Sequence, residues 1–117
     1  MEDIEKAISS LEDAVRLTPD EDAGKPGHLS NLGISLSVRF KCFGEMQDIE
    51  KGISSLEDAV RLTPNGHADG PSRLYNLGNS LLRHFEHLGE IRDIDKAISS
   101  LEGSVRLTPN GHADRPV

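Results

Sequence analysis

The sequence predicts an all-α protein made of repeated helices, and three observations favour this fold. A 16-residue segment occurs three times, at 3–18, 48–63 and 93–108, which gives a constant period of 45 residues. The segments between the copies also space their apolar residues as helices do. Aromatic residues make up only 3% of the chain, with no Trp, so an aliphatic core has to form, and that suits packed helices better than packed strands.

The recurring segment is predicted to be an amphipathic helix, called here a B helix. In the first copy Asp3 stands where an acidic side chain stabilises the start of a helix, and Thr18 followed by Pro19 ends it. Serines and charged residues occupy one face. The apolar stripe on the other face consists of Ile4, Ile8, Leu11 and Val15.

A second amphipathic helix, called an A helix, is predicted between the copies, at about 27–43 and 72–88. Gly44 and Gly89 follow these ranges and are typical of helix C-termini. The linkers, such as PNGHADGP, contain turn-forming residues throughout. The sequence therefore predicts five helices in the order B-A-B-A-B. Their apolar stripes are Leu29, Leu32, Leu36, Phe40 and Phe43, and Leu74, Leu77, Leu81, Phe85 and Leu88.

Each A helix contains an interior glycine, Gly33 or Gly78. A glycine inside a helix costs about 1 kcal/mol relative to alanine, so its presence needs a structural reason. We predict that the paired B helix approaches closely at these points, where it carries the small residues Gly52 and Ala97.

Composition restricts the partners. A net charge of −7 without any basic cluster argues against nucleic acid, whose binding depends on clustered Lys and Arg. No apolar run approaches the roughly 20 residues of a membrane span, and no leader segment is apparent. The single cysteine, Cys42, cannot form an internal disulfide. We therefore expect a cytoplasmic protein that contacts neither membranes nor nucleic acid.

The sequence shows no arrangement of side chains that is typical of a catalytic or metal-binding site. His84 and His87 are close enough to share a helix face, but no further ligands are placed to complete a metal shell. His67 and His112 belong to the repeated linker, where turn formation explains them better than acid–base chemistry does. We expect no enzyme activity, no metal and no cofactor.

The residues resemble tetratricopeptide repeats. YNLGN at 75–79 is similar to the first-helix signature of that family, and KAISSLEGSVRLTP at 96–109 is similar to the second helix. The family unit has about 34 residues, and the longer unit here resembles variants in kinesin light chains and in near-identical arrays of large fungal proteins. The resemblance implies a right-handed α-solenoid of antiparallel pairs, with a half repeat at 3–19 and full repeats at 27–64 and 72–109. Residues 1–117 would then be one segment of a longer array.

The same resemblance implies a recognition or scaffolding role, with protein or an extended peptide bound on the concave face of the A helices. Asparagine amides can hold a peptide backbone because they both donate and accept hydrogen bonds, although bracing of neighbouring helices would explain them equally well. The A helices carry a net charge of +3 and the B helices −5, so an acidic peptide is expected. The expected binding residues are Ser30, Asn31, Ile34, Ser37, Val38, Tyr75, Asn76, Asn79, Leu82 and Arg83.

Both ends of the chain interrupt the repeat, and interior faces of stacked repeats need neighbours or polar caps. We therefore expect open apolar end faces that form a homo-oligomer. The alternative to peptide recognition is a structural spacer whose repeats only stack and self-assemble. The expected end faces are Ile4, Ile8, Leu11 and Val15 at one end and Ile98, Leu101 and Val105 at the other.

Overall fold

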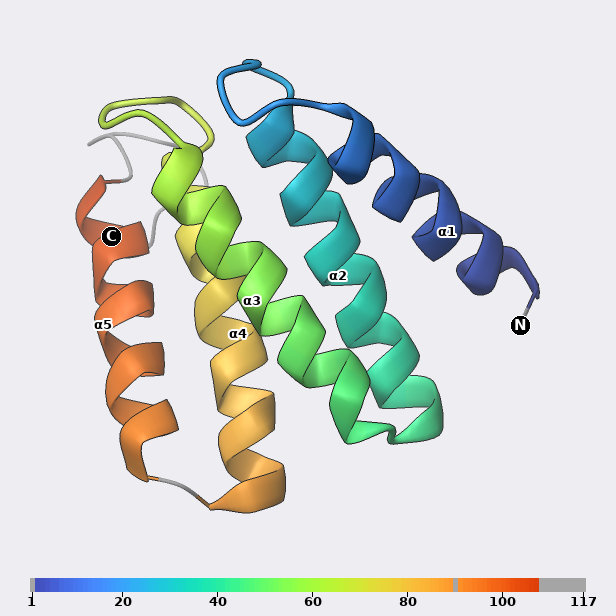
Figure 1. Cartoon of the computed structure of the whole chain (residues 1–117). Coiled ribbons are helices and arrows are strands. Elements are labelled where there is room, and N and C mark those ends of the chain that lie inside the picture. The colour runs from blue at the N-terminus through green and yellow to red at the C-terminus, as the bar shows by residue number, and fades with distance from the viewer. Residues whose placement is uncertain (1, 90, 108–117) are drawn as a thin grey trace. The chain divides into compact units, whose positions relative to one another are not determined.

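The computed structural model describes residues 2–89 and 91–107, and within these ranges the chain is all-α, with five helices and no strand (Figure 1). The five predicted helices are thus confirmed. The predicted end of the last repeat at Pro109, and the linker that holds His112, lie outside the described residues. The helices are α1 (Glu2–Leu17), α2 (Lys25–Phe43), α3 (Met46–Leu62), α4 (Gly70–Leu88) and α5 (Ile91–Leu107).

The chain divides into two compact units, residues 1–63 and 64–117. The first contains α1, α2 and α3, and the second contains α4 and α5. The described helices include none that is long and apolar enough to cross a membrane.

The ends of the A helices, α2 and α4, follow from their glycines and prolines. Each helix starts two residues earlier than expected, because Pro26 or Pro71 fits into the first turn. The N–H groups of this turn have no partner within the helix, so proline loses no hydrogen bond there. Each ends at a glycine in the left-handed region: φ is 75° at Gly44 and 69° at Gly89. The N–H groups of these glycines donate to carbonyls one turn back, which confirms the predicted helix ends.

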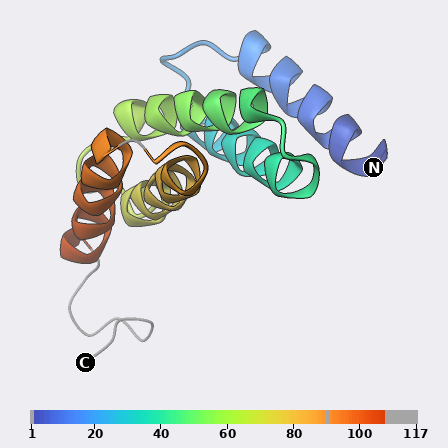
Figure 2. The ribbon, with the colours of Figure 1, turned by 90° about the horizontal axis from the view of Figure 1, so that it is seen from below.

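In the first unit α2 and α3 pack side by side along their length, and α1 lies against α2 (Figures 1 and 2). The side chain of Ile8 in α1 is only 2% exposed and packs against Leu32 and Leu36 of α2. α2 therefore supplies apolar side chains to both of its neighbours. The buried apolar residues of this unit are Ile8, Leu29, Leu32, Leu36, Phe40, Ile49, Ile53, Leu56 and Ala59.

The predicted close approach at the interior glycines is confirmed. A Cβ atom built on Gly33 would lie 2.5 Å from Leu56 Cγ and 2.9 Å from the carbonyl oxygen of Gly52. In the second unit, a Cβ on Gly78 would lie 2.7 Å from Leu101 Cγ. All three distances are below van der Waals contact, so only glycine permits each pair of helices to pack this closely.

The second unit consists of α4 packed along α5, with Leu77, Leu81 and Ala97 buried between them. The hydroxyl of Ser104 donates to the carbonyl of Pro71 at 2.8 Å and joins the end of α5 to the start of α4. This bond links two positions 33 residues apart in the sequence and gives the buried hydroxyl of Ser104 an acceptor.

Candidate functional site

One face of α2 presents a polar amide and two aliphatic side chains to solvent. Asn31 is exposed, and Ile34 and Val38 keep 39% and 41% of their surface. The three residues are spaced 3 and 4 apart, so they lie on one side of the helix. We call this set the α2 face. It is held in place because the opposite side of α2 is buried against α1 and α3.

Two predicted site residues of α2 do not belong to this face. Ser30 and Ser37 are 7% and 6% exposed, so the structure removes them from the solvent-facing surface. Ser37 lies beside α3, since its Oγ would be 3.4 Å from a Cβ placed on Gly52. The helical spacing placed these serines beside the row of apolar residues and not within it. The buried side of α2 is wider than that row, because α3 approaches α2 closely at Gly52.

The corresponding residues of α4 belong to the second unit. Tyr75 is exposed, and the other predicted positions keep part of their surface. These partly exposed residues are Asn76, Asn79, Leu82 and Arg83.

An ion pair that the sequence analysis missed joins α2 to α3. Arg39 donates from Nε to Asp48 Oδ2 at 3.0 Å and from Nη2 to Asp48 Oδ1 at 2.9 Å. Asp48 is buried in the first turn of α3, where an acidic side chain was expected from the equivalent position of Asp3, and it makes no side-chain cap. The hydrogen bond to Asp48 raises the pKa of Arg39 above its usual value, because it stabilises the charged guanidinium.

The second unit contains the equivalent pair 45 residues later, with histidine in place of arginine. His84 Nδ1 and Asp93 Oδ2 lie 2.7 Å apart, and both side chains are largely buried. The signal that could have revealed these pairs was their constant separation of nine residues across the turn between an A helix and its B helix.

These ion pairs reduce the positive charge that the A helices can offer to a ligand. Arg39 was counted as a cation available to an acidic peptide, but its guanidinium is bound to Asp48. Arg73 lies 3.4 Å from Asp69, with its side chain only 12% exposed. The excess of basic residues therefore does not translate directly into a basic binding surface.

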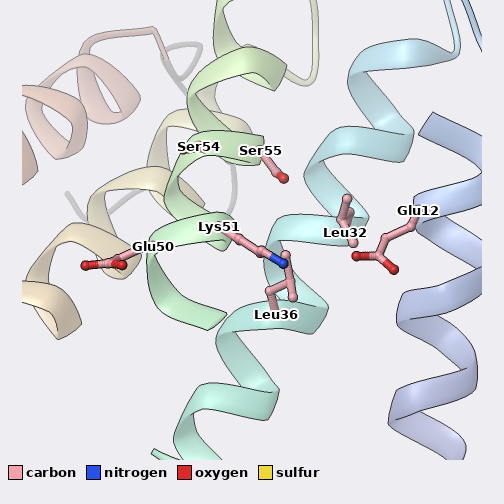
Figure 3. A pocket seen from close by; sticks show the side chains of 7 residues that line it. All are labelled: Glu12, Leu32, Leu36, Glu50, Lys51, Ser54 and Ser55. Carbon is pink, nitrogen blue, oxygen red and sulfur yellow. The ribbon is translucent and has the colours of Figure 1, made fainter. Parts of the chain in front are cut away.

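A groove of about 390 Å³ lies in the first unit, between α1 and α3, with α2 as its floor (Figure 3). Figure 3 shows Glu12 of α1 and Lys51 of α3 reaching toward it, whereas Glu50 points away from α1. The floor leucines are almost fully buried, so the groove offers little apolar area to a ligand. Its lining residues are Glu12, Leu32, Leu36, Glu50, Lys51, Ser54 and Ser55.

The predicted end faces differ from one another. The expectation of an open face on α1 is wrong, because Ile8 is buried and Ile4, Leu11 and Val15 pack against the same cluster on α2. The face on α5 is open at Ile98 and Val105, whereas Leu101 is partly buried near Gly78 of α4.

Within the described ranges, no group of three His, Cys, Asp or Glu side chains is arranged to hold a metal ion. His67 has a local structural contact, because its Nδ1 accepts a hydrogen bond from the backbone N–H of Asp69 at 3.0 Å. Comparisons of the chain with protein-family models, with curated proteins and with solved structures gave no match.

Proposed function

We propose that the chain is a protein-interaction module that binds an extended peptide on the α2 face. The observation that carries the proposal is the grouping of Asn31, Ile34 and Val38 on the exposed side of a helix whose other side is firmly packed. The two aliphatic side chains offer a site for apolar peptide side chains, and the amide can both donate to and accept from a peptide bond.

In this proposal the helix pairs α2–α3 and α4–α5 are antiparallel units of a right-handed solenoid related to tetratricopeptide repeats. The constant spacing within the chain supports this arrangement. In both helix pairs the two residues of the polar contact are nine positions apart, and both A helices carry the same interior glycine. A stack of such pairs would place the A helices on one concave surface.

The proposed ligand is an extended peptide with apolar side chains spaced to meet Ile34 and Val38. The acidic character of the peptide would be recognised by Lys41, which is exposed on the same side of α2, whereas Arg39 is bound to Asp48. Lys41→Glu tests the preference for charge separately from the apolar contact, because it should weaken the binding of acidic peptides and leave the binding of neutral peptides unchanged.

The function is tested with a displayed library of random 12-residue peptides selected on the full chain. We expect Ile34→Asp to weaken the selected peptides by about tenfold or more, because it places a charge in the apolar part of the site. Asn31→Ala should also weaken them. Ser9→Asp is the matched control, since it adds the same charge at an exposed position of α1 and should change the affinity less than about twofold.

Failure of the library to yield any peptide sensitive to Ile34→Asp would reject the α2 face as a binding site. The alternative role, a structural spacer that self-assembles, has one observation in its favour, the exposed apolar residues of α5. It predicts that substitutions on α5, and not on α2, change the behaviour of the chain.

A further inference from the structure

One side of α5 is apolar and open to solvent. Ile98 keeps 47% of its surface and Val105 keeps 59%, and they lie two helical turns apart on the same side. We call these two residues the open α5 face. The side chain of Leu101 between them is partly buried toward α4, which is the helix packed against α5 within the described part of the second unit.

The same side chains occur at the equivalent positions of α1, where the structure shows what covers them. Ile98 and Val105 correspond to Ile8 and Val15, two periods earlier. In α1, Ile8 forms one buried cluster with Leu32 and Leu36 of α2, which are spaced one turn apart, and Val15 packs against this cluster. An identical pair of apolar side chains on a helix of nearly identical sequence therefore has a known complement within this chain.

A lysine closes one end of the contact between α1 and α2. Nζ of Lys25 donates to the carbonyl oxygens of Val15 and Thr18, both at 2.7 Å, and so satisfies acceptors at the C-terminus of α1. The carbonyl of Val105 holds the corresponding place on α5. A helix that covers α5 in the same way would gain from a basic residue at its start.

Acidic residues border the other part of the contact. The pKa of Arg39 in α2 is raised mainly by its hydrogen bond to Asp48. The negative charges of Glu5 and Glu12 in α1 raise it further, by smaller amounts. Acids recur at the corresponding positions of α5, as Asp95 and Glu102, and both are exposed. The border of the open α5 face therefore attracts a cation on the covering helix.

We propose that the open α5 face binds a separate amphipathic helix with the chemistry of α2. That helix carries two leucines one turn apart, a lysine seven residues before the first leucine and an arginine seven residues after it, as Lys25, Leu32, Leu36 and Arg39 are placed. A second copy of the chain is a poor donor, because its own α1 already covers this side of α2. The site does not depend on peptide binding at the α2 face.

The probe is a labelled synthetic peptide with the sequence of residues 25–43, with Cys42 replaced by Ser, titrated against the full chain and followed by fluorescence anisotropy. We expect saturable binding that Ile98→Glu or Val105→Glu weakens by about tenfold or more, because each buries a charge against leucine. Both positions are exposed, so the variants should keep the circular dichroism spectrum of the parent chain.

Two controls locate the site and its chemistry. Ile34→Glu on α2 should leave binding of the probe unchanged, which separates this site from the α2 face. A peptide of residues 70–88 retains the leucines as Leu77 and Leu81 but has Gly70 and His84 in place of the two cations. It should bind about threefold or more weakly than the α2 peptide at neutral pH.

Binding that is absent, or that survives Ile98→Glu, overturns the proposal. So does equal affinity for the two peptides, because the cations would then have no role. If sedimentation of the chain alone shows an oligomer that Ile98→Glu dissociates, the occupant is a second copy and the proposed partner is wrong.

Discussion

Replacing Arg39 by Met is expected to lower the free energy of unfolding by about 2–4 kcal/mol, because it leaves the buried carboxylate of Asp48 without its charged partner. The side chain of Arg39 is 28% exposed, so the expected loss lies below the upper end for a fully buried pair. Methionine keeps much of the aliphatic length of arginine, so the loss reports the missing charge and hydrogen bonds more than missing packing. The change in the free energy of unfolding is measured by urea denaturation of the full chain, monitored by circular dichroism.

The double variant with Asp48→Leu provides the control. Removing both charges removes the unpaired carboxylate, so the double variant should recover most of the stability lost by Arg39→Met. A double variant that is no more stable than the single one would show that the unpaired carboxylate of Asp48 does not cause the loss.

The sign of the pH dependence follows from the raised pKa of Arg39. A cation whose pKa is raised by folding contributes its full stability below the unfolded-state pKa, and the contribution is lost only as the pH rises through the folded value. Both values lie far above neutrality. The contribution of Arg39 should therefore be the same at about pH 6 and about pH 8.

The helices were predictable from the sequence because apolar spacing, prolines and glycines act locally. Gly33 could also be assigned a packing role, since a glycine inside a helix is unfavourable unless another helix approaches it. The ion pair of Arg39 with Asp48 was not predicted, because each residue had a satisfactory local explanation, as a cation near one helix end and an acid near the start of the next. Only their recurrence as His84 and Asp93 indicates a contact between helices.

The end faces show a second limit of periodicity. The apolar face of a B helix is wide enough to pack against two neighbouring helices. The sequence pattern does not show which of these helices is present. In α1 the side carrying Ile8 faces α2 and is covered, whereas in α5 the side carrying Ile98 is open. Nearly identical sequences therefore have different exposure, and only the arrangement of the helices distinguishes them.

Gly33→Ala is expected to destabilise the first unit by about 1–3 kcal/mol, even though alanine is the better helix former by about 1 kcal/mol. The added methyl group would lie 2.5 Å from Leu56 Cγ and 2.9 Å from the carbonyl oxygen of Gly52. Leu56 is fully buried and cannot rotate into solvent, and a backbone carbonyl moves only if α3 moves. The overpacking must therefore exceed the gain in helix propensity, and thermal and urea unfolding of the full chain should show it.

Two other glycines provide a graded control for this effect. At Gly78 the added methyl group would meet Leu101 Cγ at 2.7 Å but the facing carbonyl, on Ala97, only at 3.3 Å, so Gly78→Ala should cost less than Gly33→Ala. At Gly70, in the first turn of α4, a Cβ meets nothing within 4 Å, so Gly70→Ala should leave stability unchanged or raise it slightly. The expected order of destabilisation is Gly33, then Gly78, then Gly70. Equal effects at Gly33 and Gly70 would mean that the helices separate freely, and that close packing does not set the position of α2 against α3.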